Sequence, residues 1–90
     1  MANQLSPEAG AAIVAHGLYC WHRSLLQELA TYGPNNTHAL ASNTGAQRLD
    51  TARNLAQLLD AGMVVPAKPV HDYTLAPWFA VTPLGRAWAA

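Results

Sequence analysis

The 90-residue sequence has a single cysteine and few charged residues. One cysteine excludes a disulfide framework and any zinc site built on four cysteines. Charged residues make up only 11% of the chain, and five Lys and Arg balance five Asp and Glu. This balance excludes a polybasic arm that would bind nucleic acid through phosphate attraction alone. With 51% hydrophobic residues the chain is also too apolar for a disordered tail.

Motifs for catalysis and export are missing as well. The sequence has no Gly-Xaa-Ser-Xaa-Gly elbow and no phosphate-binding glycine loop, so we expect no enzymatic activity. The apolar stretch from Ala9 to Trp21 follows residues without Lys or Arg, unlike a signal peptide. His16 and the residues that follow Trp21 keep it shorter than the roughly 20 residues of a membrane-spanning helix. We therefore expect a soluble, cytoplasmic protein without membrane contact.

Alanine is what the sequence has in excess, at 18 of 90 residues. Alanine favours helix but buries little area, so the sequence predicts one small, mainly helical domain over residues 1–90 with a thin core. A second subunit would complete such a core, and we expect a homodimer.

The residues Ser-Pro-Glu at positions 6–8 are typical of a helix start. They predict an N-terminal helix over residues 6–32, which Gly33-Pro34 ends. The larger apolar residues recur every three or four positions and predict a single buried stripe: Val14, Leu18, Trp21, Leu25, Leu29 and Tyr32. Gly10 and Gly17 leave open a kink or a separate first half.

Capping residues at 35–37 precede a short predicted helix over residues 38–42, and Ser42–Gly45 predicts a tight turn. Thr44 and Gln47 have the spacing of a capping box for a third helix that runs to Ala61. Residues 37–61 therefore form a predicted helix-turn-helix. Short β-branched and aromatic runs predict a strand pair over residues 63–82, and Thr82-Pro83 begins a last helix over residues 83–90.

This order, two helices joined by a glycine turn and followed by a β hairpin, is typical of a winged helix-turn-helix, a mainly α fold with a small β hairpin. From Leu29 to Arg86 the sequence resembles ArsR- and MarR-like bacterial transcriptional regulators. The matching residues are Gly33-Pro34, Leu40-Ala41, Gly45, Leu55, Leu58, the run Ala61-Gly62-Met63-Val64 and the segment Thr82-Pro83-Leu84-Gly85-Arg86. The resemblance implies a small DNA-binding regulator whose terminal helices form a dimer interface.

With Leu55 and Leu58 facing inward together with Ala52 and Leu59, the third helix presents a polar outer face. Gln, Asn and Arg are the side chains that form paired hydrogen bonds to base edges, mostly from the first half of a recognition helix. The predicted DNA-binding residues are Thr44, Gln47, Arg48, Asp50, Arg53, Asn54, Gln57 and, in the wing, Lys68.

The charge of this segment keeps a second function open. From Gly33 to Arg86, four cations stand against three anions, so the net charge is +1. A DNA-binding domain usually carries a clear basic stripe. The alternative is a winged-helix module, like small phage-type accessory proteins, that binds a protein partner instead of DNA.

The remaining candidates lie near the chain ends. Ile13, Cys20 and Trp88 are the predicted dimer contacts. His16 and Cys20 are one helical turn apart, but two ligands on one helix do not make a metal site. We therefore expect no metal and no cofactor.

Overall fold

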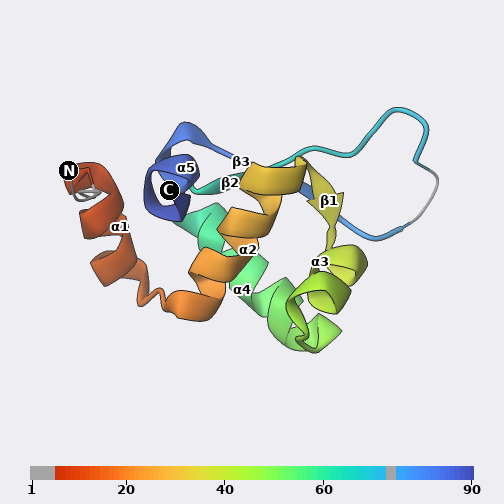
Figure 1. Ribbon diagram of the computed structural model, residues 1–90, viewed down its shortest axis with the longest axis horizontal. Helices are drawn as coiled ribbons and strands as arrows, with labels where there is room; N and C mark the ends of the chain where they lie inside the picture. The colour runs from red at the N-terminus through yellow and green to blue at the C-terminus, as the bar shows by residue number, and fades with distance from the viewer. Residues whose placement is uncertain (1–5, 73–74) are drawn as a thin grey trace.

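The computed structural model describes residues 6–72 and 75–90. Figure 1 shows helices packed around a small sheet. Between β2 and β3, residues 67–72 and 75–77 extend away from the helices. This is the predicted winged helix-turn-helix, a mainly α fold with a small sheet. The elements are α1 (Pro7–His16), α2 (Cys20–Tyr32), β1 (Asn35–Asn36), α3 (Thr37–Thr44), α4 (Arg48–Asp60), β2 (Val64–Pro66), β3 (Trp78–Val81) and α5 (Pro83–Ala89).

The predicted single helix over residues 6–32 is two helices. Gly17 ends α1 with φ 59°, a left-handed conformation that glycine adopts without strain, and the Leu18 N–H then bonds back to the Ile13 carbonyl at 3.0 Å. Because α2 starts in a new direction, the single buried stripe was wrong. Val14 and Tyr32 are 83% and 76% exposed, whereas Leu18, Leu25 and Leu29 are buried.

The helix-turn-helix has the predicted order, but α3 runs to Thr44, so the turn predicted over Ser42–Gly45 was wrong except at Gly45, and one predicted cap differs. Asn36 caps α3 by accepting the Ala39 N–H at 2.8 Å, and Gly45 ends α3 with φ 71°. The Thr44 hydroxyl instead donates to the Leu40 carbonyl at 2.7 Å, inside its own helix. Thr44 is thus the last residue of α3, and the predicted capping box with Gln47 was wrong because α4 begins only at Arg48, with no side-chain cap.

The sheet contains one strand that the sequence did not predict. β1 pairs antiparallel with β3, which pairs antiparallel with β2, so the strand order is β1-β3-β2. Val64 lies opposite Val81, as expected for the predicted wing hairpin. Two-residue β1 gives no alternating pattern, and only its long-range pairing with Trp78 and Phe79 defines it.

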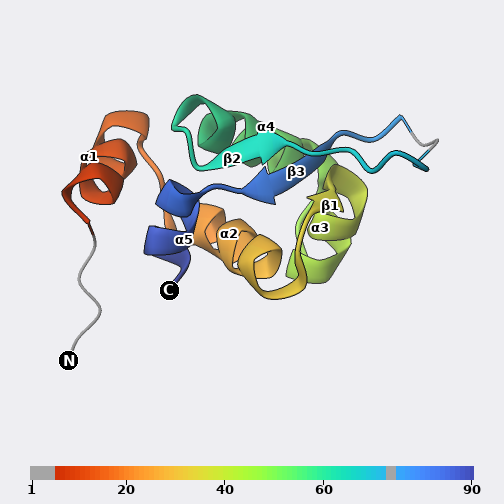
Figure 2. The same cartoon turned by 90° about the horizontal axis from the view of Figure 1, so that it is seen from above.

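The core lies between α2, α4, α5 and the sheet. β3 packs on α2 and β2 packs on α4, and Figure 2 shows both strands between these helices. Along α4 the buried side chains are Thr51, Leu55 and Leu58. Ala52 and Leu59, which we predicted on the same face, are exposed, because a residue one position further along a helix is turned by about 100°.

Candidate nucleic-acid interface

The exposed face of α4 carries most of the predicted DNA-binding residues. Gln47, Arg48, Asp50 and Arg53 are exposed and occupy the first half of the helix or the position before it. Thr51, Leu55 and Leu58 anchor one face of α4 in the core and leave Arg53 on the opposite one, whereas Gln47 and Arg48 are exposed because they lie at the N-terminal end of the helix. The structure therefore places one compact group of hydrogen-bonding side chains at the start of α4.

Apolar residues also lie on this outer surface, and the sequence analysis missed them. Leu49 is 72% exposed, and Ala56 is exposed as well. At about 100° per residue, Ala56 lies roughly 100° and Leu49 roughly 120° around the helix from the buried Leu55, on the side that carries Arg53. Helical geometry alone could have identified them, but the prediction considered only side chains that form hydrogen bonds.

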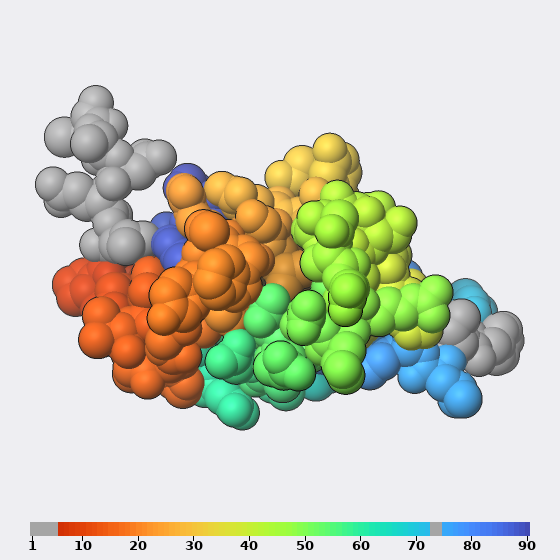
Figure 3. All heavy atoms as spheres, turned by 90° about the horizontal axis from the view of Figure 1, so that it is seen from below, coloured from red at the N-terminus to blue at the C-terminus, as the bar shows by residue number. Residues whose placement is uncertain are grey.

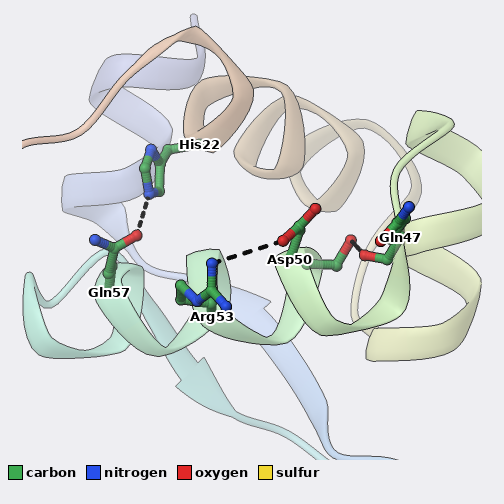
Figure 4. A network of polar contacts seen from close by, with 6 residues as sticks. His22, Gln47, Asp50, Arg53 and Gln57 are labelled. Carbon is green, nitrogen blue, oxygen red and sulfur yellow. Dashed lines mark hydrogen bonds and ion pairs between the residues drawn. The ribbon is translucent and has the colours of Figure 1, made fainter.

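Two of the candidates form an ion pair with each other. Arg53 Nη1 lies 3.7 Å from Asp50 Oδ1, and the two side chains are 67% and 57% exposed (Figure 4). An exposed pair one turn apart contributes less than about 1 kcal/mol and is weakened by salt. Arg53 is therefore easily released to another acceptor, and Asp50 is the group that opposes an anionic ligand here.

Gln57, on the flank of α4, is oriented by a buried histidine from α2. His22 is only 1% exposed, and its Nδ1 accepts the Tyr19 N–H at 2.9 Å. The ring proton therefore lies on Nε2, which donates to Gln57 Oε1 at 2.7 Å (Figure 4). This bond occupies the carbonyl oxygen of Gln57 and leaves its NH₂ group for other partners.

Asn54 and Gln57 border a groove between α4 and the start of α2. Its volume is about 430 Å³, and Figure 3 shows the two segments side by side on one face of the molecule. The walls from the α1–α2 corner carry aromatic rings, whereas the α4 wall is polar. The lining residues are Gly17, Tyr19, Trp21, His22, Ala46, Asp50, Arg53, Asn54 and Gln57. Both Asn54 and Gln57 are half-buried here, so they project sideways more than outward.

The other two predicted DNA contacts lie on other elements. Thr44 lines a small cavity with Asn54, close to the start of α4, but its hydroxyl already bonds within α3. Lys68 is exposed in the wing just after β2, in a segment whose Val70 and Leu75 are 90% and 98% exposed. The structure thus groups the α4 residues and leaves Lys68 apart from them in the wing.

The predicted dimer contacts differ in how much of each side chain is exposed. Cys20 is exposed, and Ile13 is half-buried against the core. Trp88 is only 8% exposed and belongs to the core, so its ring is not free for a partner as we had expected. Its burial results from close packing of α5 on α2, where Arg23 Nε donates to the Trp88 carbonyl at 2.8 Å.

Within residues 6–72 and 75–90, no three His, Cys, Asp or Glu side chains come together as metal ligands would. Within the same ranges, no helix has both the length and the apolar character needed to cross a membrane.

No protein-family model and no curated protein matches the sequence, but solved structures do match the fold. YusO of Bacillus subtilis is 13% identical with a TM-score of 0.73, over 92% of this chain and 58% of that one. The MarR family transcription regulator SP03579 is 17% identical with a TM-score of 0.71, over 90% and 53%. A possible transcriptional regulator for arsenical resistance is 23% identical with a TM-score of 0.65, over 93% and 78%.

These matches confirm the predicted likeness to MarR- and ArsR-like regulators at the level of the fold. The chain spans just over half the length of the first MarR structures that it matches. At such low identity the likeness concerns the arrangement of helices and strands alone.

Proposed function

We propose that the protein is a DNA-binding transcriptional regulator that inserts the start of α4 into the major groove. The observation that carries this proposal is the exposure of Gln47, Arg48 and Arg53 at the start of α4, a helix whose buried face is fixed on a winged-helix scaffold. Arg and Gln side chains form paired hydrogen bonds to guanine and adenine edges. Two of the three named structural neighbours are described as transcription regulators, which supports the same function.

The low charge limits how this protein binds. Phosphate neutralisation supplies most non-specific affinity, and one copy offers mainly Arg48 and Lys68 for it. We infer that a homodimer binds an inverted repeat, so that two α4 helices contribute together. Four phosphate contacts per dimer correspond to a slope of roughly −4 for log affinity against log salt. Specific binding should therefore depend more on base contacts than in strongly basic regulators.

Fluorescence anisotropy with labelled fragments from the upstream region of the gene tests this function. We expect specific binding at low salt, and Arg53→Ala should reduce it by about tenfold or more because one bidentate base contact contributes roughly 1–3 kcal/mol. Arg86→Ala is the matched control: Arg86 is exposed on α5, where it borders Gln27 and Thr31. Equal losses in both variants, or no binding to any fragment, would contradict the proposal.

A protein-binding module is the second candidate, and the apolar side chains on the outer surface favour it. Leu49 on α4 and Val70 and Leu75 in the wing are all at least 72% exposed. Under this alternative Leu49→Ser and Val70→Ser weaken capture of one stoichiometric protein partner, while no fragment binds even at low salt. Specific binding of one inverted repeat would exclude this as the main function.

A further inference from the structure

We propose that Leu49 determines part of the DNA sequence preference by contacting the C5 methyl group of a thymine in the major groove. Leu49 is the second residue of α4 and is 72% exposed. An apolar side chain recognises a base edge through the thymine methyl, because it has no group that could form a hydrogen bond. This contact depends on the proposed function, since it requires α4 to lie in the major groove.

Leu49 lies on the outermost side of α4. The buried face of the helix is formed by Thr51, Leu55 and Leu58. From the middle of that face, at about 100° per residue, Leu49 lies roughly 150° around the helix and Arg53 roughly 170°. The two residues are four positions apart and are therefore neighbours on the helix surface. A helix that brings Arg53 to a base edge thus brings Leu49 into the same groove.

Small residues surround Leu49 on this side of the helix. Ala52 and Ala56 are exposed three and seven residues after Leu49, which places them along the same side. The side chain of alanine is a single methyl group, so these positions do not hold the helix away from a groove that is about 12 Å wide. Leu49 therefore projects from a shallow surface that can approach the base edges closely.

The apolar area around Leu49 fits a methyl group better than a protein partner. The nearby side chains of Arg48, Asp50 and Arg53 are exposed and charged. Leu59, 39% exposed, lies roughly 15 Å further along the helix. A stable protein interface buries about 1,200–2,000 Å² around a core that is depleted of charged residues. One leucine among charged side chains and alanines does not supply such a core, but it can cover one methyl group.

The low charge of the protein makes an apolar contact with DNA valuable. Charged residues make up only 11% of the chain, and attraction to phosphates weakens as the salt concentration rises. Covering apolar surface releases no counterions, so the thymine contact should be nearly independent of salt. Burial of one methyl group strengthens binding by about fourfold. For a homodimer that reads two half-sites, the combined effect is on the order of tenfold.

Replacement of thymine by deoxyuridine tests the contact, because it removes the methyl group and keeps the hydrogen-bonding edge. The probe is the tightest-binding duplex that the full chain selects at low salt from random sequences of about 20 base pairs. Each thymine is replaced in turn, in both half-sites, and affinity is measured by fluorescence anisotropy. We expect one position at which the replacement weakens binding about tenfold, by a factor that stays constant as salt rises. Leu49→Ala should bind the thymine and deoxyuridine duplexes equally.

Leu59→Ala is the matched control, since it shortens a partly exposed leucine near the other end of the same helix. It should keep the full preference for thymine. Leu49→Ala leaves the buried face of α4 intact, and an unchanged thermal midpoint shows that the variant is folded. A thymine preference that survives in Leu49→Ala would overturn the proposal, as would loss of the preference in both variants.

Failure of this contact differs from failure of the proposed function. If the chain selects a duplex, yet no deoxyuridine replacement separates the unsubstituted protein from Leu49→Ala, DNA binding stands and only the thymine contact is overturned. If the chain selects no duplex at low salt, the proposed function fails and the thymine contact fails with it.

Discussion

The Thr82 hydroxyl donates a 2.7 Å hydrogen bond to the carbonyl oxygen of Gly62, 20 residues earlier. The Thr82 hydroxyl oxygen also accepts the Gly85 N–H at 3.1 Å and so caps α5. The Thr82 backbone N–H also bonds to the Met63 carbonyl at 3.0 Å. One residue therefore ties the end of α4 to the start of α5 and closes the base of the wing.

We expect Thr82→Val to lower the free energy of unfolding by about 1–2 kcal/mol, because it removes both the cap and the bond to Gly62 without changing the side-chain volume. Urea denaturation measures this change. Thr31→Val, on an exposed turn of α2, is the matched control and should change stability by less than about 0.5 kcal/mol. Similar losses in both variants would contradict the role assigned to the cap.

Gly85→Ala should destabilise the fold more strongly. A Cβ atom at Gly85 would collide with the Met63 carbonyl oxygen and the Val81 side chain, so α5 would have to move off the sheet. We expect a loss of about 1–3 kcal/mol or more in thermal denaturation. Gly10→Ala is the opposite case: nothing lies within 4 Å of its added Cβ in α1. That variant should gain up to about 1 kcal/mol, and a loss there comparable to Gly85→Ala would contradict the packing argument.

The sequence predicted the helix-turn-helix, the wing and the last helix because caps, glycines and apolar spacing are local signals. Gly62 and Thr82 illustrate this, since each marks an element boundary where the structure has one. The sequence left the break at Gly17 open, because the same apolar pattern fits either one helix with an interior glycine or two helices joined at that glycine. β1 was missed because its only signal is pairing with β3, which lies about 40 residues later.

The candidate site was predictable in part. The period of α4 identified Arg53 as exposed once Leu55 was placed inside, and Gln47 is exposed just before the helix begins. The contact of His22 with Gln57 was not predictable, because it depends on how α2 crosses α4. The groove follows from the same crossing. Its aromatic wall comes from the α1–α2 corner, and the sequence pattern had assigned Trp21 to a buried stripe.

Removing the negative charge beside Arg53 should strengthen DNA binding. Asp50→Asn frees Arg53 from its ion pair and removes repulsion of phosphates at the start of α4. We expect affinity to rise about threefold to tenfold, equivalent to about 0.7–1.4 kcal/mol, in anisotropy titrations at low salt. Stability should fall by about 0.5 kcal/mol because an acid in the first turn stabilises a helix.

Glu8→Gln is the charge-matched control, since Glu8 is exposed in the first turn of α1. It removes one negative charge from α1, which lies at the opposite end of the molecule from α3 and the start of α4 (Figure 1). It should change DNA affinity by less than about twofold because exposed charges are screened beyond a Debye length. If both variants strengthen binding equally, total charge rather than release of Arg53 is responsible. If Asp50→Asn weakens binding, the carboxylate itself contacts a base.

A double-mutant cycle between His22 and Gln57 measures how firmly α2 and α4 are joined. His22→Ala should cost about 2–4 kcal/mol, because it leaves a cavity at a residue only 1% exposed and removes the acceptor for the Tyr19 N–H. Gln57→Ala, at a half-buried position, should cost about 1 kcal/mol. We expect the double variant to be more stable than the sum of the two losses implies by about 1 kcal/mol, the coupling typical of side chains in direct contact. Strict additivity in urea denaturation would mean that the 2.7 Å contact contributes nothing, and that packing of the His22 ring alone fixes α2 against α4.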